Sequence, residues 1–164
     1  MPAKTDVDIR PSTIGEARAA GLDDLLISHW SEVETNTDEI PLDLNWPLYL
    51  HNERMGMYRA LGAYRGPKLV GYNAFFVQPT LHHQQTIHAF NDVIFLDQAE
   101  RKGLLGARLI KTAEPWLRGF GVRLIVYETK EAPHFEHGKA RGTLSRLLEN
   151  LGYPERARLH EKLL

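Results

Sequence analysis

The residues best suited to chemistry form a loop between an apolar run and an amphipathic segment. The apolar run is residues 93–96, and a polar turn follows it. Arg101 and Lys102 then stand beside Gly103, just before the amphipathic segment begins. The first N–H groups of a helix have no intrahelical partner, and the helix dipole adds positive potential there. The sequence therefore predicts a loop that binds phosphate groups.

Two other kinds of ligand fit the sequence less well. His82, His83 and His88 lie close together in the chain, as metal ligands can. Neighbouring side chains on a strand point to opposite sides, and no acidic residue stands at a fixed spacing from these histidines, so we expect no metal site. The loop also lacks the G-K-[S/T] ending of a P-loop and the G-x-G-x-x-G of a dinucleotide site, which weakens the hypothesis of a nucleotide-binding module.

The elements that position this loop follow from hydrophobic periodicity and turn residues. The expected order is a strand at 7–10, helices at 15–30 and 47–55, strands at 57–64, 69–77 and 86–96, a helix after the loop, a strand at 122–129, a helix at 143–150 and a strand at 156–164. Three antiparallel strands thus lead into the loop, and the strand–helix–strand unit around it requires a parallel crossover. We therefore expect an α/β (α+β) fold with a mixed, mostly antiparallel sheet and helices on both faces.

Composition narrows the classes of function. A chain of 164 residues is expected to form one domain over residues 1–164. Its net charge of −1 gives no electrostatic case for nucleic acid or an anionic membrane. The chain has no cysteine, which excludes disulfides, thiolate zinc sites and a cysteine nucleophile. No run is long and apolar enough to span a bilayer and residues 1–8 lack the apolar core of a signal peptide, so we expect a cytoplasmic protein.

The element order, with the loop at its centre, resembles the GNAT N-acetyltransferase superfamily over residues 7–164. Residues 96–109 are similar to the family's acetyl-CoA pyrophosphate loop, whose pattern is Q/R-x-x-G-x-G/A. Arg101 takes the first position and Gly106 the last, while Leu104 stands where the middle glycine is expected. Residues 147–153 resemble the family segment L-Y-E-K-x-G-F, and residues 161–164 resemble its usual strand ending.

This resemblance implies acetyl-CoA as a cosubstrate. Loop amides would hold the pyrophosphate, and the strand before the loop would pair with the pantetheine arm where two parallel strands splay apart. A backbone N–H near Leu96 would polarise the thioester carbonyl. The expected acetyl-CoA-binding residues are Phe95, Leu96, Arg101, Lys102, Gly103, Leu104, Leu105, Gly106 and Ala107.

The resemblance also implies direct attack by a primary amine, which must be neutral and therefore needs a base. Asp92 is the first candidate, because it lies four residues before Leu96 and is expected on the same face of the strand. His88 shares that face by spacing and could relay a proton. Tyr127 is the candidate acid on the facing strand, because the family's tyrosine falls on Leu148, which cannot donate a proton.

Each candidate also has a purely structural interpretation: an ion-paired carboxylate, a partly exposed strand histidine and a core tyrosine. The competing function is a catalytically degenerate GNAT fold that binds CoA or a protein partner. Leu148 favours that alternative, and the retained loop from Arg101 to Gly106 argues against it.

Three further segments suggest how the protein would contact the amine acceptor, the cofactor and a second copy of the chain. The acidic stretch at 32–43 could attract a cationic amine, but the acceptor itself is not specified by the sequence. Lys130, Lys139 and Arg141 could meet the adenosine phosphates. The exposed final strand at 156–164 could pair across a homodimer, since an unprotected edge invites pairing.

Overall fold

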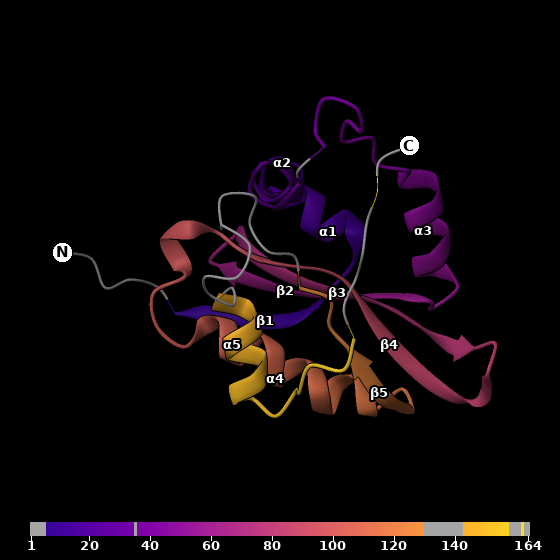
Figure 1. The fold of residues 1–164 in the computed structure, drawn as a ribbon. Helices are drawn as coiled ribbons and strands as arrows, with labels where there is room; N and C mark the ends of the chain where they lie inside the picture. Colours follow the sequence, from indigo (N-terminus) through magenta and orange to yellow (C-terminus); the bar gives the residue numbers. More distant parts are fainter. Residues whose placement is uncertain (1–5, 35, 130–142, 158–161, 163–164) are drawn as a thin grey trace.

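The computed structural model describes residues 6–34, 36–129, 143–157 and 162, and places a five-stranded sheet between two sets of helices (Figure 1). Neighbouring strands are antiparallel except for the last two, which are parallel. The predicted mixed sheet is therefore confirmed. In spatial order the strands are β1 (Val7–Ser12), β2 (Tyr58–Arg65), β3 (Lys68–Thr80), β4 (His83–Leu96) and β5 (Val122–Val126).

The helices cover both faces of this sheet (Figure 1). One face carries α1 (Ile14–Ala19), α2 (Leu22–Val33) and α3 (Trp46–Arg54). The other carries α4 (Leu105–Arg118) and α5 (Thr143–Asn150), and a short 3-10 helix, η1 (Gln98–Glu100), precedes α4. None of the described helices is both long and apolar enough to cross a membrane.

Burial follows these two layers. Helix α4 repeats apolar residues every four positions, and Leu105, Leu109, Ala113 and Leu117 are all buried against the sheet. Their partners in the sheet include Leu61, Phe75 and Ala89. On the opposite face, buried residues of α1 and α2 pack on aromatic residues of β2, β3 and β4; this cluster is Ala17, Leu22, Leu25, Tyr64, Leu69, Tyr72 and Phe95.

The single helix predicted at 15–30 is wrong, because the chain forms two helices there. Gly21 adopts φ +104°, a left-handed conformation that interrupts helical geometry and that glycine tolerates best. The carbonyl of Ala20 accepts a hydrogen bond of 2.9 Å from the N–H of Leu69 on β3. The break therefore ties α1 to the sheet and lets α2 run on to Val33 in a new direction.

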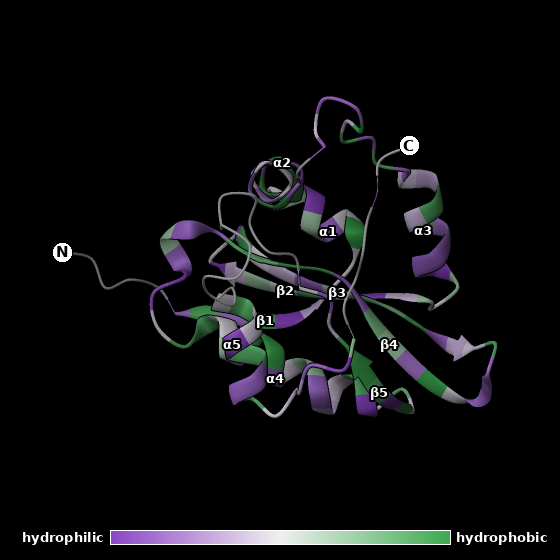
Figure 2. Cartoon of the chain, viewed as in Figure 1, coloured by the Kyte–Doolittle hydropathy of each residue, from purple (hydrophilic) through white to green (hydrophobic). Residues whose placement is uncertain are grey.

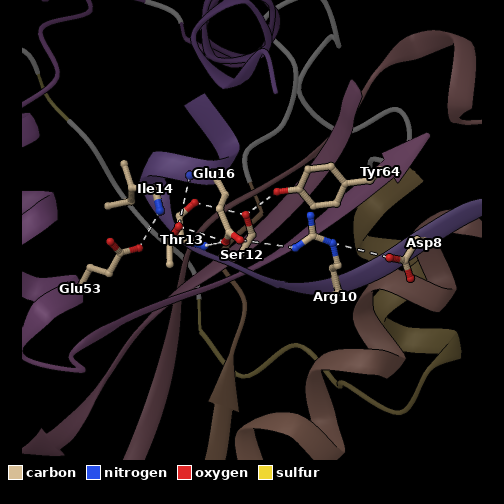
Figure 3. Close-up of polar contacts among 8 residues, drawn as sticks. All are labelled: Asp8, Arg10, Ser12, Thr13, Ile14, Glu16, Glu53 and Tyr64. Carbon is tan, nitrogen blue, oxygen red and sulfur yellow. Dashed lines mark hydrogen bonds and ion pairs between the residues drawn. The ribbon is translucent and has the colours of Figure 1, made fainter. Parts of the chain in front are cut away.

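Side-chain hydrogen bonds stabilise the junction between β1 and α1 (Figure 3). Thr13 and Glu16 form a reciprocal capping box, which satisfies free N–H groups at the start of α1. The N–H of Ile14 donates to Glu53 Oε1 of α3 at 2.7 Å, so α1 and α3 share a contact. Ser12 bonds the hydroxyl of Tyr64 on β2. These contacts fix α1 over the sheet.

Strand β4 begins at His83, three residues earlier than predicted, because the turn at Leu81 and His82 is tighter than expected. Strand β5 ends at Val126, three residues short of its prediction. Its hydrophobic residues are green in Figure 2, but Leu124 is 48% exposed, because β5 lies at the edge of the described sheet. The predicted final strand lies mostly outside the described residues, as do Lys130, Lys139 and Arg141.

Candidate active site

The two parallel strands separate at the centre of the sheet. Pairing between β4 and β5 runs from Ile87 opposite Val122 to Phe90 opposite Val126. Strand β4 continues to Leu96, still paired with β3 on its other side. Within the described part of the chain, residues 91–96 therefore have no strand partner on the β5 side. Such a gap leaves backbone donors and acceptors of β4 open to an extended ligand.

A β-bulge lies in β4 where this separation begins. Asn91 stands opposite Phe75 and Val93 stands opposite Ala74, so Asp92 is an extra residue without a partner on β3. The bulge resets the alternation of side chains along the strand. Asp92 contacts residues on the α3 face, whereas Leu96 packs in the core beneath α4. The expectation that Asp92 and Leu96 share a face is therefore wrong.

The side-chain amide of Asn91 supports the bulge. Its Nδ2 donates to Asn73 Oδ1 at 3.0 Å, to the carbonyl of Ala74 at 2.9 Å and to the carbonyl of Val93 at 3.1 Å. Asn73 is fully buried and donates in turn to the hydroxyl of Tyr127 at 2.9 Å. One network of hydrogen bonds thus links the bulge to the segment that follows β5.

Asp92 is held by two tyrosine hydroxyls. Tyr49 of α3 donates to Asp92 Oδ2 at 3.1 Å, and Tyr58 of β2 donates to the same oxygen at 3.3 Å. Oδ1 has no partner among the described residues. Burial raises the pKa of Asp92 above its ordinary value, and the two hydroxyls offset part of that rise. A raised pKa makes the carboxylate a stronger base, and Oδ1 is the oxygen from which it can act.

A cavity of about 480 Å³ opens beside Asp92. Its walls come from α1, α2 and α3 and from the face of the sheet that these helices cover. They include Leu26, Trp46 and Tyr49. Asn91 and Glu128 also line it, so the cavity reaches the place where β4 and β5 separate. A molecule in the cavity would contact Asp92, which lies on β4 just beyond the last residue paired with β5.

The loop after β4 is braced by two ion pairs. The buried carboxylate of Glu100 binds Arg65 of β2, with Nε to Oε1 at 2.9 Å and the second pair at 2.5 Å. Arg101 folds back on the protein, donating to the carbonyl of Leu96 at 2.9 Å and pairing with Glu32 of α2 at 2.8 Å. Its guanidinium lies 4.9 Å from the ring centre of Phe95. Arg101 therefore shapes the loop through its side chain.

The end of this loop is suited to an anion. Lys102, Gly103 and Leu104 are exposed, and Gly103 has a φ of +104° that disfavours other residues. Leu104 precedes α4 without a side-chain cap, so the first N–H groups of this 14-residue helix, at Leu105, Gly106 and Ala107, are open to a ligand. A Cβ on Gly106 would lie 3.5 Å from Leu147 and 3.6 Å from Leu96, an ordinary packing distance. The loop thus fits a pyrophosphate.

The other two catalytic candidates lie apart from Asp92. His88 is buried on the same face as Asp92, with its ring 5.5 Å from His83 and 5.9 Å from Phe90, and does not line the cavity. Tyr127 packs on the α4 side, edge-on to Phe75. Burial raises the pKa of Tyr127, so its hydroxyl stays protonated. No group of three or more potential metal ligands occurs among the described residues.

Sequence reasoning did not find Tyr49, Tyr58, Asn73 or Asn91. Each acts through a partner at least 17 residues away in the chain, and no local spacing connects them. The one usable signal was the pair of asparagines inside hydrophobic strands, since a buried amide requires hydrogen-bond partners.

The model of the acetyltransferase (GNAT) family matches residues 21–135 of this chain. The protein belongs to the GNAT family. No curated protein matches the sequence. The matched part includes the bulge, the loop and most of the residues that line the cavity, so the predicted resemblance is confirmed.

Solved structures show the same fold at low sequence identity. An aminoglycoside acetyltransferase from an uncultured soil metagenomic sample is 14% identical, with 98% of this chain and 99% of that chain covered and a TM-score of 0.71. Ribosomal-protein-alanine N-acetyltransferase from Brucella melitensis biovar Abortus 2308 is 18% identical, with 96% and 97% covered and a TM-score of 0.67. A predicted acetyltransferase with acetyl-CoA from Clostridium acetobutylicum is 9% identical, with 96% of each covered and a TM-score of 0.66. At these identities the likeness concerns the fold.

Proposed function

We propose that this GNAT protein transfers an acetyl group from acetyl-CoA to a primary amine, with Asp92 as the base. The observation that carries the proposal is the position of Asp92 on the bulge of β4. It lines a cavity large enough for a small acceptor, and that cavity reaches the gap between β4 and β5. Acceptor and acyl donor can therefore approach each other at one carboxylate.

The loop before α4 and strand β4 would supply the groups that bind acetyl-CoA, the acyl donor. The open N–H groups at the start of α4, together with Lys102, would hold the pyrophosphate. The unpaired side of β4 beyond Phe90 would accept the pantetheine arm as an added strand. Acetyl-CoA, when bound, supplies an activated thioester, and a backbone N–H near Leu96 would polarise its carbonyl. Phe95 and Arg101 support this edge from the α2 side.

Asp92 makes the amine reactive. An ammonium group beside the carboxylate must lose a proton before it attacks, and Oδ1 would take that proton. Tyr49 and Tyr58 hold Oδ2 and so fix the direction in which Oδ1 points.

Tyr127 is the proposed acid for the departing thiolate. Its hydroxyl accepts a hydrogen bond from Asn73, which leaves its own proton free to donate. Leu148, at the position of the family's usual tyrosine, is buried and cannot take this role.

Because Leu148 cannot donate a proton, a second candidate function is a GNAT fold that binds CoA without catalysis. One experiment separates the two. Thiol release from acetyl-CoA is measured with a panel of primary amines, for the native protein and for Asp92→Asn, with Asp24→Asn as the matched control on the exposed side of α2. The enzyme proposal expects Asp92→Asn to lose about 10²- to 10⁴-fold in kcat while acetyl-CoA affinity is unchanged. Binding of acetyl-CoA with no thiol release from any amine would favour the degenerate module.

A further inference from the structure

The cavity beside Asp92 has one deep anionic group and a long apolar wall. Helix α2 directs Leu22, Leu26 and Trp30 into it, at intervals of four residues that place them on one helical face. Strands β2 and β3 contribute the small residues Ala60 and Ala74 to the floor, which leaves room for a ligand. A ligand body lying between this wall and this floor would be surrounded by apolar side chains.

The charges along the cavity all have one sign. Its described lining residues include the carboxylates of Glu34, Asp92 and Glu128, and no lysine or arginine is among them. Glu128 is exposed and Glu34 follows the end of α2, so both lie towards the rim. Asp92 lies deeper, where the hydroxyls of Tyr49 and Tyr58 both donate to its Oδ2. An ammonium group in the cavity would form a charge-assisted hydrogen bond with the Asp92 carboxylate.

Several hydroxyl groups that line the cavity are already hydrogen-bonded to protein groups. The hydroxyls of Tyr49 and Tyr58 donate to Asp92, and the hydroxyl of Tyr72 bonds His29 Nδ1 at 2.9 Å. Thr13 is engaged by Glu16 in the helix cap. Along the apolar wall of Leu22, Leu26 and Trp30, a ligand with many hydroxyl or amino groups would therefore lose hydration without gaining partners, which costs about 1–3 kcal/mol for each group in comparable cases.

We propose that the acceptor is a monoamine with a compact apolar or aromatic body, rather than a polyamine or an aminosugar. The amino group would bind at Asp92, and the body would lie along Leu22, Leu26 and Trp30. A volume of about 480 Å³ suits a molecule of this size. The inference names the substrate class of the proposed acyl transfer and rests on it for the reaction.

Four amines test the inference: ethylamine, 2-phenylethylamine, spermidine and kanamycin. With acetyl-CoA saturating, thiol release gives kcat/KM for each. We expect 2-phenylethylamine to exceed ethylamine by about 10- to 100-fold, as burial of its ring would give. Spermidine and kanamycin are expected to fall well below 2-phenylethylamine.

Two variants of α2 test whether the apolar wall of the cavity causes the preference for 2-phenylethylamine. Leu26→Ala should raise KM for 2-phenylethylamine far more than it raises KM for ethylamine, because only the phenyl ring is long enough to lie along that wall. Ile27→Ala is the matched control, since the neighbouring Ile27 is 59% exposed and does not line the cavity. Equilibrium dialysis of 2-phenylethylamine, without acetyl-CoA, measures the same preference independently of turnover.

The outcomes separate this inference from the proposed function. Efficient thiol release with spermidine or kanamycin above 2-phenylethylamine would overturn the substrate class and leave acyl transfer standing. Binding of 2-phenylethylamine that Leu26→Ala weakens, with no thiol release from any amine, would support the cavity's ligand class and overturn acyl transfer. Failure of 2-phenylethylamine both to bind and to react would overturn the inference.

Discussion

The hydroxyl of Tyr49 on α3 lies 3.1 Å from Oδ2 of Asp92 on β4. This contact joins a helix on one face of the sheet to the extra residue of a bulge. It has two consequences, because it stabilises the charged form of Asp92 and the neutral form of Tyr49. With a pKa of about 12, Tyr49 stays neutral near neutral pH and can donate this hydrogen bond.

The first prediction concerns the acid limb of the pH–rate profile. Tyr49→Phe removes a hydrogen bond that lowers the pKa of Asp92, so the pKa of Asp92 should rise. The acid limb of kcat/KM should then move to higher pH. Tyr64→Phe is the matched control, since the Tyr64 hydroxyl bonds Ser12 instead. An unmoved limb in Tyr49→Phe would show that Asp92 does not govern this ionisation.

The second prediction concerns stability at high pH. Burial, with Asp92 nearby, raises the pKa of Tyr49 to about 12 from its ordinary value of 10.0. Because the folded-state pKa is the higher one, this stabilisation is fully present below pH 10 and is lost as the pH rises towards 12. Urea unfolding between these pH values should show a steeper decline for the native protein than for Tyr49→Phe. Equal slopes would contradict the raised pKa.

The third prediction concerns the bulge. Asn91→Ala leaves two carbonyls and Asn73 Oδ1 without their donor, and should lower the free energy of unfolding by about 2–3 kcal/mol. Activity should fall as well, because the bulge sets the direction of Asp92. The exposed Asn150, at the end of α5, provides the control, and Asn150→Ala should change stability by less than about 0.5 kcal/mol. A fully stable and active Asn91→Ala protein would mean that other contacts hold the bulge.

The fourth prediction concerns the phosphate loop. Gly106→Trp places a large ring beside the open N–H groups of α4 and should abolish binding of acetyl-CoA in a calorimetric titration. Gly106→Ala should retain binding, because its Cβ would meet Leu147 and Leu96 at 3.5 Å and 3.6 Å. If the tryptophan variant binds as tightly as the native protein, the cofactor does not lie against this turn.

Local patterns predicted the order of the elements well. The amphipathic period of α4 and the loop before it are both features of neighbouring residues, and so are the three antiparallel strands with their turns. The break at Gly21 was missed, because glycine inside an apolar stripe is compatible with one helix or with two.

The spacing of residues along the sequence could not predict the geometry around Asp92. Strict alternation places Asp92 and Leu96 on one face, and a single extra residue in β4 reverses the facing of every later side chain. The bulge depends on Asn91 meeting Asn73, and the environment of Asp92 depends on tyrosines from α3 and β2. Such contacts join segments distant in the chain, and no local pattern encodes them.

The most direct test of the account is a calorimetric titration of the purified protein with acetyl-CoA, repeated with Asp92→Asn. We expect both proteins to bind acetyl-CoA with micromolar or tighter affinity, and only the native protein to release thiol when an amine is added. Absence of binding at millimolar acetyl-CoA would contradict the account, because the open turn of α4 and the gap beside β4 would then hold no cofactor.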